Sequence, residues 1–152
     1  MDEQGDTAGP VACRGLRGAT TVDGPSPAAV ADATGELLDA LVEGNDCRLD
    51  DIAAAIFTLT DDLTGSGGGD GSANPAAAAR ARGWDSVPML SVREQAGDGS
   101  LPRCIRVLIL WNTARSQRDV RHVYLRGATV LRPDLSDRKE SNPPLSSQRA
   151  EI

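Results

Sequence analysis

Histidine and cysteine are scarce in this sequence of 152 residues, which contains one histidine, His122, and three cysteines, Cys13, Cys47 and Cys104. An odd number of widely spaced cysteines fits neither a disulfide framework nor a CxxC zinc site. We therefore expect a reduced, cytoplasmic protein that holds no metal. His122 is expected at the surface, and Cys13 and Cys104 are expected to be small core residues.

Lysine and long apolar runs are scarce as well. Lysine occurs once, as Lys139, and the formal net charge is -6. Because an acidic chain is repelled by phosphate backbones and anionic bilayers, we expect no nucleic acid and no membrane as partners. The first twelve residues lack the basic and apolar regions of a secretory signal, and no apolar run reaches the about 18 residues of a membrane span.

The usual arrangements for nucleophilic and acid–base catalysis are missing too. No spacing suggests a Ser-His-Asp or Cys-His arrangement or a pair of carboxylates, which disfavours hydrolysis. The Gly-rich stretch at 64–73 contains no lysine and no strict G-x-G-x-x-G motif. It is therefore predicted to be a flexible loop rather than a phosphate-binding loop.

The remaining sequence has the size and composition of one compact domain, with 39% hydrophobic residues. Polar segments at 1–11 and 136–152 are predicted to be flexible tails around a single domain at 12–135. Alternation predicts strands at 11–22 and 51–60, and later at 86–92, 104–111, 121–125 and 128–133. Helices are predicted from Pro27 to a stop at Gly44, with Ser26 as cap, and from Pro75 to Gly83. This order indicates an α+β fold, a small mixed β-sheet with helices packed on one face.

One residue breaks the apolar pattern of the strand "CIRVLILW". Arg106 lies inside a run where both faces are mainly apolar. Since an unpaired buried charge costs several kcal/mol, Arg106 requires a carboxylate partner or a pocket that admits an anionic ligand. A structural ion pair or an edge position is the more common explanation.

Three further residues are candidates for ligand binding. Arg17 lies in the first strand between Gly15 and Gly18, whose missing side chains would let a ligand approach, although they could equally mark a bulge. Glu94 follows a strand and could pair with the arginine of "CIRVLILW" or bind a ligand hydroxyl. Tyr124 could donate a hydrogen bond, yet a lone tyrosine in a strand is more often a core residue.

Five motifs in order, "RGLRGATTV", "PAAAARARGW", "VPMLSVRE", "LPRCIRVLIL" and "RHVYLRGATVLRPDL", closely resemble the AroH-class chorismate mutases from about Arg14 to Leu135. The resemblance implies an isomerase that converts chorismate to prephenate in aromatic amino acid biosynthesis, the branch of the shikimate pathway toward phenylalanine and tyrosine. It also implies a homotrimer with a barrel-like assembly and active sites at the subunit interfaces.

The resemblance assigns roles to individual residues. Arg106 matches the arginine at the ether oxygen of chorismate, and Glu94 matches the glutamate at the ring hydroxyl; these two are the expected catalytic residues. Arg17 and Tyr124 match groups that bind substrate carboxylates. Because an intramolecular rearrangement requires a cage and fixed charge rather than a nucleophile, no cofactor is implied.

Five more positions match substrate-binding positions of the family: Arg80 near the pocket mouth, the backbone around Leu90 and Ser91, and Leu131 and Arg132 near the C-terminal end.

The sequence departs from the family in two places. The Gly-rich stretch before Pro75 resembles an insertion, and Asn74 stands where relatives usually have phenylalanine. Both bear on substrate access more than on the chemical step. The extended tail at 136–152 is expected to act as a loose lid.

Two alternatives remain at this level. An imine deaminase similar to RidA is also a small trimer that anchors a carboxylate with arginine. A non-catalytic binding module for an anionic aromatic-pathway metabolite would use Arg17 and Arg106 as a simple anion site. Glu94 and the "RHVYL" motif favour the mutase.

Overall fold

The computed structural model describes residues 9–64, 74–95, 97 and 99–134. The Gly-rich residues 65–73 and the tails at 1–8 and 135–152 lie outside the described residues, so the expectations of a flexible loop and a lid remain predictions. The elements in chain order are β1 (Ala12–Thr21), α1 (Pro27–Asn45), η2 (Leu49–Asp51), β2 (Ile52–Leu59), α2 (Asp61–Thr64), α3 (Pro75–Ala81), β3 (Met89–Arg93), β4 (Cys104–Thr113), η3 (Gln117–Asp119), β5 (Val123–Tyr124) and η4 (Arg126–Leu131).

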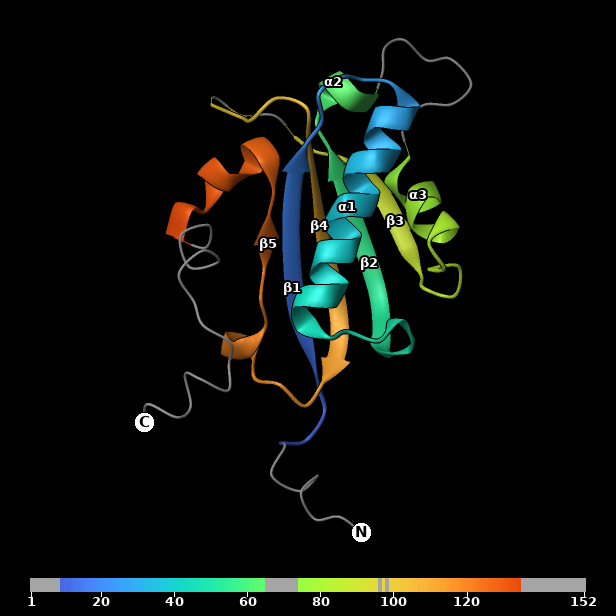
Figure 1. Cartoon of the computed structure of the whole chain (residues 1–152), viewed down its shortest axis with the longest axis vertical. Helices are drawn as coiled ribbons and strands as arrows, with labels where there is room; N and C mark the ends of the chain where they lie inside the picture. The colour runs from blue at the N-terminus through green and yellow to red at the C-terminus, as the bar shows by residue number, and fades with distance from the viewer. Residues whose placement is uncertain (1–8, 65–73, 96, 98, 135–152) are drawn as a thin grey trace.

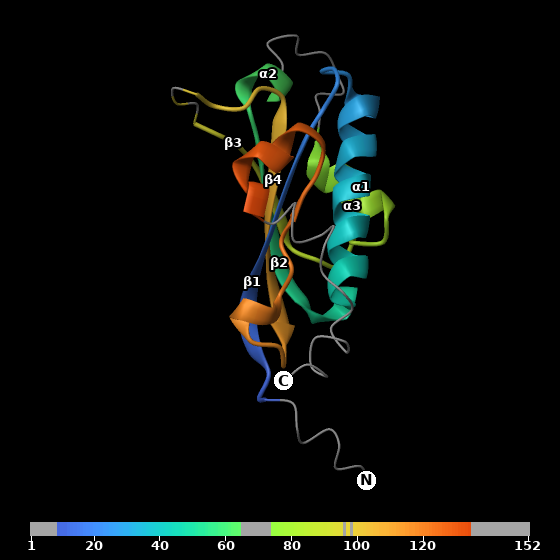
Figure 2. The ribbon, with the colours of Figure 1, turned by 60° about the vertical axis from the view of Figure 1, so that its left-hand side comes forward.

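The strands form one five-stranded sheet in the order β3-β2-β4-β1-β5. The strand β4 pairs antiparallel with both β1 and β2, whereas β3 and β5 join the edges in parallel. Figures 1 and 2 show α1 and α3 on the same side of this sheet. The prediction of a mixed sheet with helices on one face is confirmed. None of the helices in the described part of the chain combines the length and apolar composition that a membrane crossing requires.

The helix α1 begins as predicted and ends slightly later. Ser26 is the N-cap, and its hydroxyl accepts a hydrogen bond from the backbone N–H of Ala29 at 3.1 Å. The predicted stop at Gly44 is wrong, because the helix continues to Asn45. Asp46, with a φ of 53°, is the left-handed residue that ends it.

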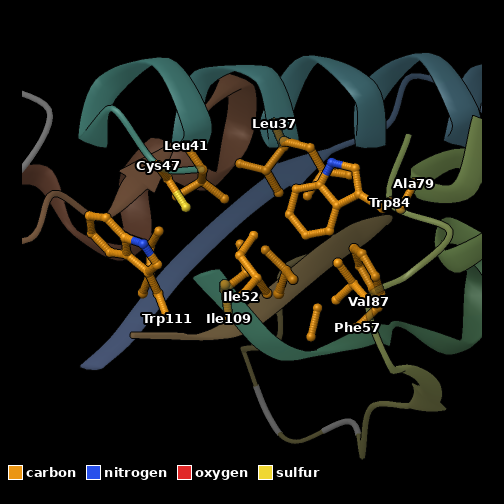
Figure 3. Packing of buried hydrophobic residues seen from close by; sticks show 14 of the residues in the cluster. Leu37, Leu41, Cys47, Ile52, Phe57, Ala79, Trp84, Val87, Ile109 and Trp111 are labelled. Atoms are coloured by element: carbon orange, nitrogen blue, oxygen red, sulfur yellow. The ribbon is translucent and has the colours of Figure 1, made fainter. Parts of the chain in front are cut away.

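The core lies between α1 and the sheet. Figure 3 shows Leu37 and Leu41 of α1 above Ile109 of β4 and Phe57 of β2, with Trp84 nearby. Each of these side chains is at most 2% exposed. Burial of large apolar side chains contributes about 1.5–3 kcal/mol each, so this layer is the main source of stability.

The alternation of β4 divides its side chains between two different environments. Val107 and Ile109 face α1 and are 1% exposed, and Trp111 on the same face is 4% exposed. Leu108, on the other face, is 40% exposed. We call the side of the sheet that α1 and α3 leave uncovered the open face, and Arg106 lies on it because it alternates with Val107.

The strand predicted at 128–133 is wrong, because residues 126–131 form the 3-10 helix η4. Arg126 adopts a left-handed φ of 52°, which turns the chain out of β5. The N–H of Gly127 then donates to Thr21 Oγ1 at 2.9 Å, and the N–H of Ala128 donates to Leu125 O at 3.0 Å. The backbone groups are therefore satisfied without a neighbouring strand.

The helix α3 begins at Pro75, as predicted, and explains the presence of Asn74. The Asn74 side chain caps this helix, since its Oδ1 accepts hydrogen bonds from the N–H groups of Ala76 at 3.0 Å and Ala77 at 3.3 Å. After α3, Gly83 has a φ of 95°, which glycine adopts readily.

Two expectations for single residues are wrong. Cys13 is exposed, because it alternates with the core-facing positions of β1 and so lies on the open face. His122 is half-buried rather than on the surface, and its Nδ1 accepts a hydrogen bond from the Arg17 N–H at 3.0 Å. Cys104 is buried as expected.

Candidate active site

Arg106 meets a carboxylate on the open face. Its Nε lies 3.0 Å from Glu94 Oε1, and the two side chains are 41% and 18% exposed. The sequence leaves two roles for Glu94, pairing with Arg106 or binding a ligand hydroxyl. This structure shows the pairing. The arginine is neither buried without a partner nor fully solvated, because a large part of its side chain remains open above the sheet.

This ion pair follows from the register of three strands. Arg106 of β4 is directly opposite Thr58 of β2. Glu94 comes immediately after β3, and its N–H donates to Leu59 O of β2 at 2.8 Å. That bond fixes the Glu94 backbone beside the row that contains Arg106. Thr58 Oγ1 then donates to Glu94 Oε1 at 2.7 Å.

The contact between Arg106 and Glu94 is an ion pair without an aligned hydrogen bond. Arg106 Nε is buried and has no hydrogen-bond partner among the described residues, although Oε1 is only 3.0 Å away. An N–H group that does not point at the acceptor gains little from the short distance. The exposed part of the guanidinium group is therefore its terminal end, which is the part available to a ligand.

A row of residues crosses the sheet at the level of Arg106. Ala19 of β1 pairs with Arg106 on one side and with Tyr124 of β5 on the other, and Thr58 continues the row into β2. Ala19 is 1% exposed and forms a small apolar cluster with Cys104, against which Tyr124 packs. Ala19 is therefore covered, and it separates Tyr124 from Arg106 along the row.

Arg17 lies two residues before Ala19 and so on the same open face. Its side chain is exposed, and none of the described carboxylates pairs with it. The charges of Arg17 and Arg132 both add to burial in lowering the pKa of His122. The backbone N–H of Arg17 donates to His122 Nδ1 at 3.0 Å, which places Arg17 beside the residue that precedes β5.

The C-terminal candidates approach the same region. Leu131, at the end of η4, packs against the cluster of Ala19 and Cys104. Arg132 follows it, and its Nε and Nη2 donate to the two carboxylate oxygens of Asp134 at 3.1 and 3.0 Å. Arg132 is thus held by its neighbour in this structure.

Three predicted residues are not part of this group. Arg80 is in the last turn of α3, on the side of the sheet that the helices cover. Ser91 alternates with the open-face residues of β3, and its hydroxyl lies 3.3 Å from Asn74 Oδ1. Leu90 does face the open side, but at the edge strand, where it is 62% exposed. Within one chain, therefore, Arg80 and Ser91 lie on the opposite side of the sheet from Arg106, whereas Leu90 shares its face at the sheet edge.

The open face also carries uncovered apolar side chains: Leu90, Val92 and Leu108 are 62%, 42% and 40% exposed. An apolar patch of this kind around polar groups is typical of a surface that another molecule covers.

A hollow of about 270 Å³ is found elsewhere, at the far end of β4, lined by Trp111, Asn112 and Thr113 among others. Both arginines that line it have a neighbour, since Arg115 lies 5.6 Å from the ring centre of Trp111 and Arg48 is 3.8 Å from Asp50. Arg106 is not among the residues that line this hollow. The candidate site described here lies on the open face of the sheet, around Arg106.

The buried thiols are not nucleophiles in this arrangement. Burial raises the pKa of the Cys104 thiol, although the nearby Arg106 charge opposes the shift. Burial, with the charge of Asp51, raises the pKa of Cys47 to about 11. Both groups are therefore neutral near pH 7.

The sequence did not single out Thr58 or Ala19. A threonine or alanine in a strand carries no signal of its own. Only the pairing of β2 and β1 with β4 places these two residues beside Arg106.

Known proteins resemble this chain over most of its length. The family model described as chorismate mutase type I matches residues 13–135. A chorismate mutase AroH from Thermus thermophilus is 54% identical over 123 residues, covering 80% of this chain and 95% of the relative. The AroH chorismate mutase of Bacillus subtilis (strain 168) is 37% identical over 124 residues, covering 81% and 92%.

The fold agrees as well. The structure of a chorismate mutase from Clostridium thermocellum matches with a TM-score of 0.70 and 41% identity, covering 76% of this chain and 97% of that one. The imine deaminase and the non-catalytic binding module gain no support from these comparisons. The matched family, the two close relatives and the shared fold together show that this chain belongs to the type I, or AroH-class, chorismate mutases.

Proposed function

We propose that this chorismate mutase rearranges chorismate to prephenate on the open face of its sheet, around Arg106. The observation that carries this assignment is the Arg106 side chain, which is held in a strand beside Glu94 at 3.0 Å and still 41% exposed. A cation fixed in this way pays little reorganisation cost when charge develops next to it.

The reaction determines what the site must supply. The rearrangement is an intramolecular [3,3] shift, in which the ether C–O bond breaks while a new C–C bond forms. Negative charge grows on the ether oxygen as the bond breaks. Positioned donors at such an oxygen are worth about 3–4 kcal/mol each in other enzymes. The terminal nitrogens of Arg106 are the donors proposed for this role.

Substrate binding is assigned to the neighbouring groups. Chorismate carries two carboxylates, and in a chain of net charge -6 it needs local positive charge to bind. Arg17 and Tyr124 are proposed to bind these carboxylates, with Arg132 close to the same edge. Leu131 supplies an apolar wall. Glu94 is proposed to accept a hydrogen bond from the ring hydroxyl.

We further propose a homotrimer in the cytoplasm, with each site completed by a second copy and with no cofactor. The division of the predicted residues supports it, since Arg80 and Ser91 lie on the opposite side of the sheet from Arg106 in a single chain. The uncovered apolar side chains of the open face supply a surface for association.

The decisive experiment is a continuous chorismate-depletion assay on the purified protein and on Arg106→Ala. Loss of Arg106 should lower kcat by at least about 100-fold, which corresponds to about 3 kcal/mol of transition-state stabilisation. Arg48→Ala serves as the control, because this arginine is exposed and only weakly paired at 3.8 Å with Asp50. An Arg106→Ala protein with the turnover of the parent chain would refute the assignment.

A further inference from the structure

Among the described residues, Thr58 is the one whose hydroxyl touches the charged pair of Arg106 and Glu94. Its Oγ1 donates to Glu94 Oε1 at 2.7 Å, and the same oxygen lies 3.0 Å from Arg106 Nε. Thr58 and Arg106 are cross-strand neighbours, so the hydroxyl and the guanidinium approach Glu94 from adjacent strands. A hydrogen bond to a charged carboxylate is among the stronger ones in proteins.

The two carboxylate oxygens of Glu94 are used differently. Oε1 takes both contacts from the protein, while Oε2 has no partner among the described residues. The side chain is only 18% exposed, which restricts the space in which it could turn. The Thr58 bond thus selects which oxygen faces the protein and which one remains for a ligand.

The geometry at Arg106 Nε shows what Thr58 prevents. The Nε–H group is buried without a hydrogen-bond partner even though Oε1 is within reach. A free carboxylate would gain by turning to accept this hydrogen bond. Such a turn would pull the guanidinium group toward Glu94 and move its terminal nitrogens away from the open face.

We infer that Thr58 is a positioning residue, which holds Glu94 so that it balances the charge of Arg106 without capturing the guanidinium group. This inference rests on the catalytic roles proposed above for Arg106 and Glu94. The contact that Thr58 makes in the site is with Glu94, and no direct role toward the substrate is assigned to it. Its contribution therefore depends entirely on Glu94.

Two substitutions of Thr58 separate the effect of its hydroxyl group from the effect of its side-chain volume. Thr58→Val removes the donor with almost no change in volume, whereas Thr58→Ser keeps it. Thr58→Val should lower kcat about 10- to 100-fold, the factor expected for one charge-assisted hydrogen bond, with a smaller change in KM. Thr58→Ser should remain within about threefold of the parent.

Thr34→Val is the matched control, because it makes the same chemical change at a buried position. Thr34 Oγ1, in α1, is buried and has no hydrogen-bond partner in the described residues. Loss of the Thr34 hydroxyl group should leave kcat unchanged. Thermal unfolding of all three variants then separates effects on the site from effects on the fold.

A double-mutant cycle with Glu94→Ala tests whether Thr58 acts through Glu94. Once Glu94 is absent, Thr58→Val should change kcat by less than about threefold, because no carboxylate remains to be held. Equal factors in both backgrounds would overturn the inference, as would full activity of Thr58→Val alone. If Arg106→Ala and Glu94→Ala were also fully active, the proposed function of the open face would fail instead.

Discussion

The guanidinium group of Arg82 crosses α1 at Gly35, where a Cβ atom would lie only 2.5 Å from Arg82 Cζ. From there Arg82 reaches the next turn of the helix, and its Nε donates to Asp39 Oδ1 at 3.1 Å. The glycine inside α1 is thus matched to an arginine from the end of α3. This contact connects the two helices that cover the sheet.

The effect of Gly35→Ala on the free energy of unfolding should depend on whether Arg82 is present. Alanine favours a helix interior by about 0.5–1 kcal/mol over glycine, but here it displaces an exposed ion pair worth about 0.2–1 kcal/mol. The single variant should therefore be nearly neutral, while the same change in an Arg82→Ala background should be stabilising. Urea unfolding of the four proteins measures this difference, and identical effects in both backgrounds would contradict the contact.

Gly18→Ala should be destabilising. A Cβ atom at Gly18 would lie 2.8 Å from Leu41 Cδ1 and 3.2 Å from the backbone oxygen of Val123, which cannot move freely. Overpacking of this kind costs about 1–3 kcal/mol. Gly44→Ala is the control, because nothing lies within 4 Å of its Cβ position and alanine favours the helix. A Gly18→Ala protein with an unchanged thermal midpoint would show that β1 and α1 are packed less closely.

Asn74→Ala should destabilise the protein by about 1 kcal/mol, through loss of the cap of α3. Asn74→Ser should recover most of that loss, because serine also caps helices. Chemical denaturation measures both. If alanine and serine were equally tolerated, the hydrogen bonds to Ala76 and Ala77 would contribute nothing to stability.

His122 should make stability depend on pH in a defined direction. Burial, followed by the charges of Arg17 and Arg132, lowers the pKa of His122 in the folded state. The unfolded state therefore binds a proton first, near pH 6.5, and stability is lost as the pH falls below that value. The neutral ring accepts the Arg17 N–H, which a protonated ring cannot do.

The measurement compares the parent protein with His122→Gln, which does not titrate. Carboxylates contribute equally to both proteins and cancel in the difference between their free energies of unfolding. That difference should shrink or reverse between about pH 7.5 and pH 5.5. A difference that is constant over this range would mean that the folded and unfolded states protonate His122 alike.

Leu108→Glu should interfere with the proposed association of copies. Leu108 is 40% exposed on the open face, and a charge there would be buried if another copy covered it. Sedimentation should then show a smaller species than for the parent protein. Ala31→Glu is the control, on the exposed side of α1. If both variants sediment like the parent, the open face is not the contact surface.

Much of the sheet could be predicted because strands and helices have different periods. Alternation predicts strands at 11–22 and 104–111, and β1 and β4 form there. The segment 128–133 has similar composition but was misassigned, because the left-handed backbone at Arg126 cannot be read from an arginine. The end of α1 was missed by one residue for the same reason, since Asp46 rather than a glycine adopts the left-handed conformation.

The site was less accessible to prediction than the fold. Arg106 is conspicuous in the sequence because charged side chains rarely lie in apolar strands. For Glu94 the sequence favours neither an ion pair with Arg106 nor a contact with a ligand hydroxyl. Its contact with Arg106 depends on the parallel pairing of β3 with β2, which no local pattern encodes. Thr58 gave no signal at all, because its importance comes only from its two neighbours.

The exposed leucines and valine of the open face bear on how the protein would behave on dilution. Each Å² of apolar surface removed from water contributes about 25 cal/mol, and a solitary copy forgoes that gain on this side of its sheet. If assembly recovers it, folding and association are linked by mass action. The melting temperature should then climb with protein concentration, so that a value measured at one dilution would not characterise the chain at another.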